Sequence, residues 1–336
     1  MSNPIKYFNT NAATRLNADD PSKNAGLTLA YRTFGSPKNP AVLIPSCFSG
    51  RVASTLSFLY EAPNAVLKDY FVIVCGLLGG SDSSSPSNGP TSVRGSNFPD
   101  VSYETNIRLQ RALCDALGIT QLEGYIGYSM GGQQAYYMAV LYPSFVKHVV
   151  ILGSSARTSW QNKSCLGGAM TALLNSSDWQ DGLYDRPAHK GTRSFARAYA
   201  TWALSANWFR QERWNDLGHS TLEEYLVKNW DEGMGAWDAH DLLCMLVCWL
   251  AGDITLLNSE SSFSSALASI EAKVLLMPCR SDLFFPPEDN EEELKHLRHG
   301  EIKVIESIWG HMAAGEWAQK EDQRFIESSV QQFLSS

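Results

Sequence analysis

The chain has 336 residues and a hydrophobic share of 44%, which fit a globular protein with a large core, built as one domain with an insertion or as two domains. Its formal net charge of −8 is not offset by any basic run, so binding to nucleic acid or to an anionic membrane is not expected. The longest apolar run, residues 242–251, is too short to cross a bilayer and is typical of a buried helix.

The termini and the cysteines favour a cytoplasmic protein. The N-terminus, MSNPIKYFNTN, lacks the charged and then apolar pattern of a secretory signal, and the C-terminus is not a peroxisomal address. The seven cysteines form no CxxC pair, a usage typical of reduced thiols. Cys244 and Cys248 lie one helical turn apart inside the apolar run, where packing explains them better than metal binding. We therefore expect no metal site.

The first hundred residues alternate between strand-like runs and loops. Two runs, 5–8 and 27–34, predict an opening antiparallel hairpin, and the short apolar runs 41–45 and 71–77 predict buried strands. The loop at 78–100 is rich in Gly, Ser and Pro. Because it is too long for a simple connection, we expect it to be either functional or mobile.

A strand that runs directly into a helix follows the amphipathic helix predicted at 103–117. Residues 122–128 are apolar or aromatic, as in a buried strand, and residues 130–142 carry apolar side chains at helical spacing. The two meet at Gly127-Tyr128-Ser129-Met130-Gly131, the G-x-S-x-G pattern of a nucleophile elbow. Glycine is needed on both sides because strand and helix approach closely there. The alternative interpretation is an ordinary glycine-rich turn. The predicted strand before it and the predicted helix after it favour the nucleophile elbow over this alternative.

Strands and helices alternate up to the strand predicted at 146–152, as a mostly parallel sheet flanked by helices requires. The alternation then stops until the strand-like run 273–277. Eight of the ten tryptophans fall between these two strands, in helical patterns, so we expect most to be core and a few to line an apolar pocket. The sequence therefore predicts an α/β fold, with a core domain at 1–156 and 266–336 and a helical lid inserted at 157–265.

Two further residues complete a candidate catalytic triad with Ser129. Asp282 and His311 each follow the carboxyl end of a predicted strand, the edge at which sites of open parallel sheets gather. Acyl transfer through serine needs a base and a carboxylate that orients it, and the order Ser, Asp, His is the one found with this elbow. Glu288 and Asp289 compete with Asp282, but they have the position of a helix start.

The backbone next to the nucleophile supplies the expected oxyanion hole. We expect its donors to be the N–H of Met130, the residue after the nucleophile, and the N–H of Phe48, in the loop after strand 41–45. Each such donor typically lowers the barrier by about 3 kcal/mol. Cys47 and Tyr128 directly precede Phe48 and Ser129, and we expect both side chains to contact the substrate.

Several separate motifs, in the same order, resemble those of the homoserine O-acetyltransferases, a branch of the α/β-hydrolase superfamily. The similarity covers most of the chain, and the residues that carry it are FVIVCGLLGGSDSSSP, Asn97-Phe98-Pro99, LQRALCDALGI, GYSMGGQQA, Ser177-Asp178-Trp179, Ala196-Arg197, Ser281-Asp282, Phe285-Pro286-Pro287 and Gly310-His311. The resemblance implies an α/β-hydrolase fold, a triad at Ser129, Asp282 and His311, and an oxyanion loop at Cys47-Phe48-Ser49-Gly50. It also implies a ping-pong reaction in which acetyl-CoA acylates the serine and an alcohol collects the acyl group.

Two positions relate to the substrate of that family. Its members carry an aspartate after the catalytic histidine, which holds the substrate ammonium, whereas this chain has Met312. The family arginine that binds the substrate carboxylate is kept as Arg197, for which a structural ion pair with a lid carboxylate is the alternative. Because Met312 is uncharged, homoserine itself is not the expected substrate.

These observations predict a serine-dependent acyl-transfer enzyme. The first expectation is hydrolysis of an ester or thioester of an apolar small molecule, with or without a carboxylate group, in a step of secondary metabolism. The second is O-acetyl transfer from acetyl-CoA to an alcohol, and the third is a noncatalytic binding protein on a hydrolase fold. No bound cofactor is expected, because acetyl-CoA or another acyl-CoA would be a substrate. Relatives are often dimers, so a homodimer is also among the expectations.

Overall fold

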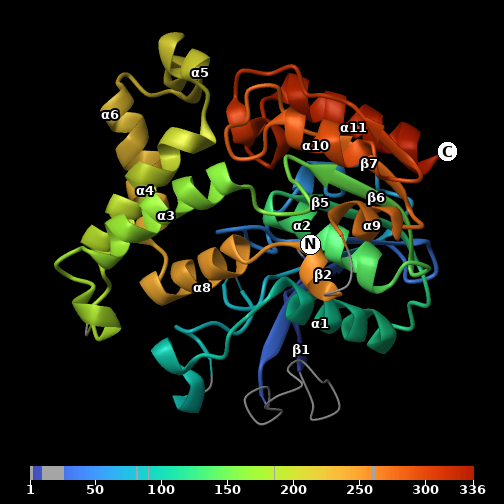
Figure 1. The fold of residues 1–336 in the computed structure, drawn as a ribbon, viewed down its shortest axis with the longest axis horizontal. Coiled ribbons are helices and arrows are strands. Elements are labelled where there is room, and N and C mark those ends of the chain that lie inside the picture. Colours follow the sequence, from blue (N-terminus) through green and yellow to red (C-terminus); the bar gives the residue numbers. More distant parts are fainter. Residues whose placement is uncertain (1–2, 10–25, 81, 90, 185, 259–261) are drawn as a thin grey trace.

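The computed structural model describes residues 3–9, 26–80, 82–89, 91–184, 186–258 and 262–336, and these residues form one eight-stranded sheet (Figure 1). The strand order is β1-β2-β4-β3-β5-β6-β7-β8. The strands are β1 (Lys6–Asn9), β2 (Thr28–Phe34), β3 (Ala41–Pro45), β4 (Phe71–Cys75), β5 (Leu122–Tyr128), β6 (Val146–Leu152), β7 (Lys273–Met277) and β8 (Gly300–Ile302). β2 is antiparallel to β1 and to β4, and the pairs from β4 to β8 are parallel. The predicted hairpin and the mostly parallel sheet are thus confirmed.

Helices cover both faces of this sheet. Tyr125 and Gly124 are neighbours in β5, so they point to opposite faces. The Tyr125 hydroxyl donates to Gln110 of α1 (Tyr103–Ala116), at 2.6 Å. A Cβ at Gly124 would lie 3.2 Å from Leu334 of α11 (Lys320–Leu334). Helices α1 and α11 therefore lie on opposite sides, and α2 (Met130–Leu141) continues from β5.

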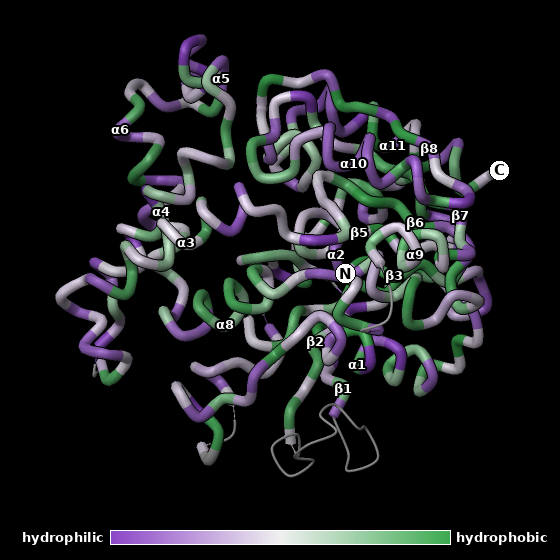
Figure 2. The backbone as a smooth tube through the Cα atoms, viewed as in Figure 1, coloured by the Kyte–Doolittle hydropathy of each residue, from purple (hydrophilic) through white to green (hydrophobic). Residues whose placement is uncertain are grey.

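The apolar residues of the central strands form the core. Every residue of β3 and of β4 is buried. This agrees with the sequence, in which continuous apolar runs predicted strands that are covered on both faces. Strand β6 and helix α8 (Ala239–Leu250) carry long apolar stretches (Figure 2). The predicted buried helix at 242–251 corresponds to α8. No helix in the described part of the chain is long and apolar enough to span a membrane.

A helical segment is inserted between β6 and β7 and lies to one side of the sheet (Figure 1). Its helices are α3 (Trp160–Leu174), α4 (His189–Ala203), α5 (Ala206–Arg210), α6 (Leu222–Tyr225), α7 (Glu232–Gly235) and α8. Its two ends meet where Arg157 bridges Asp253 and the Thr158 amide donates to the Gly252 carbonyl at 2.8 Å. The Tyr137 hydroxyl of α2 donates to the Asp253 carbonyl, so the chain has already returned to the core there. The division at 157 and 265 stays a prediction.

The remaining elements are short or lie near the C-terminus. They are α9 (Phe263–Ala268), α10 (Pro287–Leu294), a π-helix at Leu226–Asp231, and 3-10 helices at Ser57–Leu59, Thr91–Val93, Gly95–Asn97, Gln180–Gly182, Arg213–Leu217, Ile254–Leu257 and Gly310–Ala314. The closing helix α11 follows a 3-10 helix and a turn, which occupy the residues before it. Strand β8 has three residues, and an isolated bridge from Cys279 to Ile305 lies beyond its end.

The long loop after β4 is held against the lid where the structure describes it. Asp241 of α8 accepts hydrogen bonds from the Ser85 hydroxyl at 3.0 Å, from the Ser87 amide at 2.9 Å and from the Ser87 hydroxyl at 2.6 Å. A Cβ at Gly80 would lie 2.2 Å from the sulfur of Met245, also in α8. This close packing explains the glycines of the loop. The loop therefore connects the core to the lid.

Candidate active site

Ser129 lies at a sharp turn between β5 and α2. Its backbone angles are φ 55 and ψ −123, a strained conformation for a residue with a side chain. A Cβ at Gly127 would lie 2.0 Å from the Gly131 carbonyl oxygen, and one at Gly132 would lie 2.4 Å from Cβ of Ser154. Strand and helix therefore approach too closely for a side chain at Gly127, as the G-x-S-x-G pattern predicted. At Gly131, the second glycine of the pattern, a Cβ would instead lie 3.1 Å from the carbonyl oxygen of Pro45 in β3.

Replacing Gly127 with alanine should destabilise the fold strongly. The new Cβ would collide with backbone atoms of Gly131 and Gly132, which cannot move without breaking the elbow. We expect a loss of at least 3 kcal/mol of unfolding free energy, or no soluble protein, in urea denaturation. Gly167→Ala in α3 is the matched control, because nothing lies within 4 Å of its Cβ and a helical alanine should stabilise slightly. Equal stabilities for the two variants would contradict this account of the elbow.

The structure brings the three predicted triad residues together. Nε2 of His311 is 2.8 Å from Oγ of Ser129, and Nδ1 of His311 is 2.7 Å from Oδ2 of Asp282. All three residues are buried, and Ser129 is 2% exposed. The network assigns a proton to Nδ1, which donates to the carboxylate, and leaves Nε2 to accept the serine proton. A serine so placed can be deprotonated as it attacks an acyl carbon.

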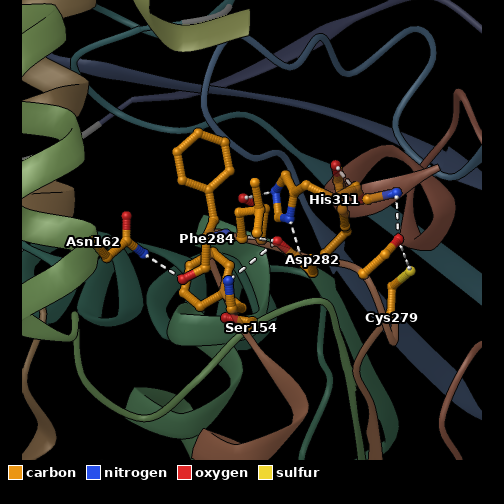
Figure 3. A network of polar contacts seen from close by, with 12 residues as sticks. Ser154, Asn162, Cys279, Asp282, Phe284 and His311 are labelled. Carbon is orange, nitrogen blue, oxygen red and sulfur yellow. Dashed lines mark hydrogen bonds and ion pairs between the residues drawn. The ribbon is translucent and has the colours of Figure 1, made fainter. Parts of the chain in front are cut away.

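The loop after β7 fixes the Asp282 carboxylate. Its Oδ1 accepts hydrogen bonds from the backbone amides of Phe284, at 2.8 Å, and Phe285, at 3.1 Å, while Oδ2 faces His311. Figure 3 shows the carboxylate between His311 and the Phe284 backbone, and Asn162 of α3 bound to the Phe284 carbonyl. The two oxygens thus have separate partners.

The competing carboxylates, Glu288 and Asp289, lie in the first turn of α10, as expected for a helix start.

One expected oxyanion donor, Met130, directly follows Ser129, and the other, Phe48, lies in the loop after β3. Met130 is the first residue of α2, so its amide has no acceptor within the helix. Phe48 lies in a turn closed by the Gly50 amide, which donates to the Cys47 carbonyl at 3.0 Å. Gln134 of α2 donates to the Ser46 carbonyl at 3.0 Å and ties this turn to the elbow helix. The oxyanion role of both amides stays a prediction.

Aromatic side chains from the lid and from the core loops form a connected cluster that reaches His311 of the triad. The Phe48 ring lies 5.8 Å from Phe195, 5.4 Å from Tyr199 and 5.9 Å from Trp249, measured between ring centroids. The rings of Phe284 and Phe285 lie 5.3 and 5.5 Å from the His311 ring. We call these six aromatic residues (Phe48, Phe195, Tyr199, Trp249, Phe284 and Phe285) the aromatic wall. Such a wall offers apolar contacts to a molecule bound at the triad.

Arg197 is not brought to the triad. It lies on α4, two residues after Phe195 and two before Tyr199, so it faces away from the side that packs on Phe48. Its guanidinium donates to Glu223 at 2.8 and 2.9 Å and twice to Asp231 at 2.6 Å. Both carboxylates belong to the lid. The ion pairs favour the structural alternative for Arg197, and substrate binding by this residue stays a prediction.

Replacing Arg197 with alanine should lower the melting temperature without changing substrate preference. The partly exposed pairs contribute about 1 kcal/mol or less each, and none of them touches the triad. The ratio of the Michaelis constants for an ester that carries a free carboxylate and for the methyl ester of the same compound should be the same in the variant and in wild type. Arg193→Ala, an exposed residue of the same helix, is the control and should leave both quantities unchanged. A Michaelis constant that rises in Arg197→Ala only for the substrate with the free carboxylate would show that Arg197 binds the substrate.

The other three expected substrate contacts lie close to the triad. The Tyr128 ring stacks on His311 at 4.9 Å, and its hydroxyl donates to the His311 carbonyl at 3.1 Å. Met312 is half-buried in the 3-10 helix that begins at Gly310. Cys47 is buried, and burial raises the pKa of its thiol, which remains neutral. Substrate contact by Cys47, Tyr128 and Met312 stays a prediction.

Two residues near the triad were not predicted from the sequence. Burial raises the pKa of Glu316 to about 7, the nearby His311 lowers it, and the Leu56 amide donates to its carboxyl group. Although part of Glu316 reaches the surface, its Oε2 is buried without a hydrogen-bond partner. Tyr199 was missed as well, although the Phe195 and Tyr199 pair at helical spacing signals a buried face. In the described part of the chain, no cluster of three or more potential ligands could hold a metal ion.

Comparison with known proteins places this geometry in a family. Residues 40–164 match the alpha/beta hydrolase fold family. The chain is 29% identical over 312 residues to an ethyl acetate hydrolase of Pseudomonas veronii, an alignment that covers 91% of this chain and 88% of that protein. It is 30% identical over 320 residues to a homoserine O-succinyltransferase of Neisseria gonorrhoeae, with 84% and 83% covered. The structure of an acetylester hydrolase from Corynebacterium glutamicum matches with a TM-score of 0.87 and 26% identity, over 93% and 91% of the two chains.

The sheet, the elbow and the matches together define an enzyme of the α/β-hydrolase class. Within this class, the chain belongs to the family that contains homoserine O-acyltransferases and related esterases. The resemblance inferred from the separate motifs is thereby confirmed.

Proposed function

We propose that this enzyme hydrolyses short, uncharged esters through a covalent acyl-enzyme at Ser129. The observation that carries the proposal is the hydrogen-bonded series Ser129, His311 and Asp282 inside the aromatic wall. His311 takes the serine proton as Oγ attacks the ester carbonyl, and it then gives that proton to the departing alcohol. Water, deprotonated by the same His311, releases the acid and restores the serine.

The surroundings of the triad support a small, uncharged substrate. The aromatic wall offers apolar contacts, and Arg197, the cation expected to bind a carboxylate, is engaged by two lid carboxylates. The carboxylate-bearing substrate expected from the sequence therefore loses its support. Two of the similar proteins are named as hydrolases of ethyl acetate and of acetyl esters. A place in secondary metabolism stays a prediction.

Acyl transfer to an alcohol is the second candidate. It is favoured by the similarity to a homoserine O-succinyltransferase, at 30% identity over most of both chains. In that reaction an acyl-CoA would acylate Ser129 and an alcohol would replace water, so CoA would be a substrate and no bound cofactor is needed. The uncharged Met312 disfavours an amino-acid acceptor. The homodimer expected from the resemblance also stays a prediction.

Product analysis separates the two candidates. The enzyme is given ethyl acetate or acetyl-CoA as the donor, in buffer alone or with homoserine or a simple primary alcohol. We expect acetate from ethyl acetate, at a rate that the added acceptor leaves unchanged, and no O-acetylhomoserine. Acetyl-CoA turnover that requires an alcohol and yields its acetyl ester would instead establish a transferase.

A further inference from the structure

Tyr199 is a lid residue of the aromatic wall that contacts two loops of the core. Its ring centroid is 5.4 Å from that of Phe48, in the expected oxyanion loop, and 4.9 Å from that of Phe284. The Phe284 ring in turn packs edge-on against His311 at 5.3 Å. Tyr199 therefore spans the space between the loop that follows β3 and the loop that carries Asp282. A substrate bound to Ser129 would lie beside it.

The Tyr199 hydroxyl has no hydrogen-bond partner among the described residues, although the residue is only 7% exposed. Other lid tyrosines use their hydroxyls: that of Tyr184 donates to Asp238 at 2.8 Å, and that of Tyr225 accepts from the Trp230 indole at 3.0 Å. The Tyr199 hydroxyl at the aromatic wall is therefore available to donate to a bound molecule.

The hydroxyl is a donor throughout the physiological pH range. Burial raises the pKa of Tyr199 well above its ordinary value, and negative charge at Cys47 or Asp282 would raise it further. The aromatic wall contains a second unused donor, because the indole N–H of the buried Trp249 also lacks a partner in the described structure. The Tyr199 hydroxyl can therefore donate to a substrate oxygen beside the aromatic wall.

We propose that the Tyr199 hydroxyl donates a hydrogen bond to the alkoxy oxygen of the bound ester and so selects oxygen esters over thioesters. The proposal rests on the proposed hydrolysis. The amides of Met130 and Phe48 are expected to hold the carbonyl oxygen, which leaves the alkoxy oxygen as the remaining acceptor of an ester. As the carbon–oxygen bond breaks, that oxygen gains negative charge and receives its proton from Nε2 of His311. Tyr199 keeps its own proton and stabilises the charge by hydrogen bonding.

Thioesters respond differently for a chemical reason. Sulfur accepts hydrogen bonds weakly, and a thiolate leaves more readily than an alkoxide, so the Tyr199 hydroxyl contributes less. A mere packing role for Tyr199 would affect both substrate types alike. The ratio of kcat/KM for the oxygen ester to kcat/KM for the thioester therefore reports on the hydrogen bond itself.

The test compares wild type with Tyr199→Phe on ethyl acetate and on S-ethyl thioacetate. We expect kcat/KM to fall about 10- to 100-fold for the oxygen ester, as for a lost hydrogen bond to a charged group, and less than about 3-fold for the thioester. The melting temperature should not fall, because no hydrogen bond within the protein is lost. Tyr225→Phe is the matched control: it removes the partner of Trp230, so it should lower the melting temperature and leave the substrate ratio unchanged.

The outcomes separate the inference from the function on which it rests. An unchanged kcat/KM in Tyr199→Phe, or an equal loss for both substrates, would overturn the assignment of Tyr199 while leaving hydrolysis intact. If wild type hydrolyses neither substrate in a Ser129-dependent way, the proposed function fails, and the assignment fails with it.

Discussion

Ser129→Ala should fold normally and hydrolyse ethyl acetate with a kcat about 10⁴- to 10⁶-fold below that of wild type. The Ser129 hydroxyl has its hydrogen bond with His311, so its loss removes the nucleophile and little else. Alanine has the same Cβ as serine and meets no new atoms in the elbow. Turnover by gas chromatography of the released ethanol and thermal unfolding by circular dichroism would measure the two properties separately.

A neighbouring serine supplies the control for this variant. Ser154 is buried beside the elbow helix, and its hydroxyl has no hydrogen-bond partner in the described structure. Ser154→Ala should therefore keep both the fold and most of the turnover. A fluorophosphonate should label wild type and Ser154→Ala but not Ser129→Ala. Undiminished turnover by Ser129→Ala would remove the serine from the reaction.

Asp282→Asn should lower kcat by about 10³- to 10⁴-fold with little change in structure. Oδ1 of Asp282 accepts two backbone amides, so the asparagine oxygen would keep that place and its NH2 group would face Nδ1 of His311. Nδ1 would then have to accept a hydrogen bond, which moves the ring proton to Nε2. A protonated Nε2 cannot take the proton from Ser129. The rate of acylation should therefore fall because His311 has the wrong tautomer. Pre-steady-state kinetics would measure this rate directly.

Asp289→Asn tests whether the correct carboxylate has been identified. Asp289 lies seven positions along the chain in the first turn of α10, and it was the alternative that the sequence left beside Asp282. This variant should retain nearly full turnover. A loss in Asp289→Asn together with full activity in Asp282→Asn would contradict the triad.

The proximity of the three candidate triad residues could be predicted because their sequence signals are local. The glycines around Ser129 mark the elbow, and Asp282 and His311 each follow the end of a strand-like run. Parallel strands bring such ends to one edge of a sheet, so the sequence predicts proximity without any knowledge of the contacts. The hydrogen bonds at 2.7 and 2.8 Å agree with that prediction.

The surroundings of the triad could not be predicted because they depend on distant contacts. Arg197 has its two carboxylate partners 26 and 34 residues further along the chain, on separate lid elements. Only the folded lid shows that Glu223 and Asp231 neutralise it. The loop after β4 is likewise fixed by Asp241, whose bonds to Ser85 and Ser87 span more than 150 residues.

The tryptophans show the same limit. The expectation that most of them are core agrees with Trp208 and Trp249, which are fully buried, whereas Trp160 is 85% exposed. Helical spacing does not tell these cases apart, since all three lie on helices. Which aromatic residues reach the triad depends on how α4 and α8 pack on the core, and that packing is a property of the whole fold.

Intact-protein mass spectrometry after a rapid acid quench tests the central claim, a covalent acyl-enzyme at Ser129, most directly. Wild type and Ser129→Ala are mixed with excess 4-nitrophenyl acetate for milliseconds to seconds, and peptide mapping locates any added mass. The account predicts an acetyl-sized gain on Ser129 of wild type that decays in water at the rate of turnover, and no such gain on Ser129→Ala. Rapid, Ser129-dependent turnover without an adduct at any time, or an equal gain on Ser129→Ala, would contradict it.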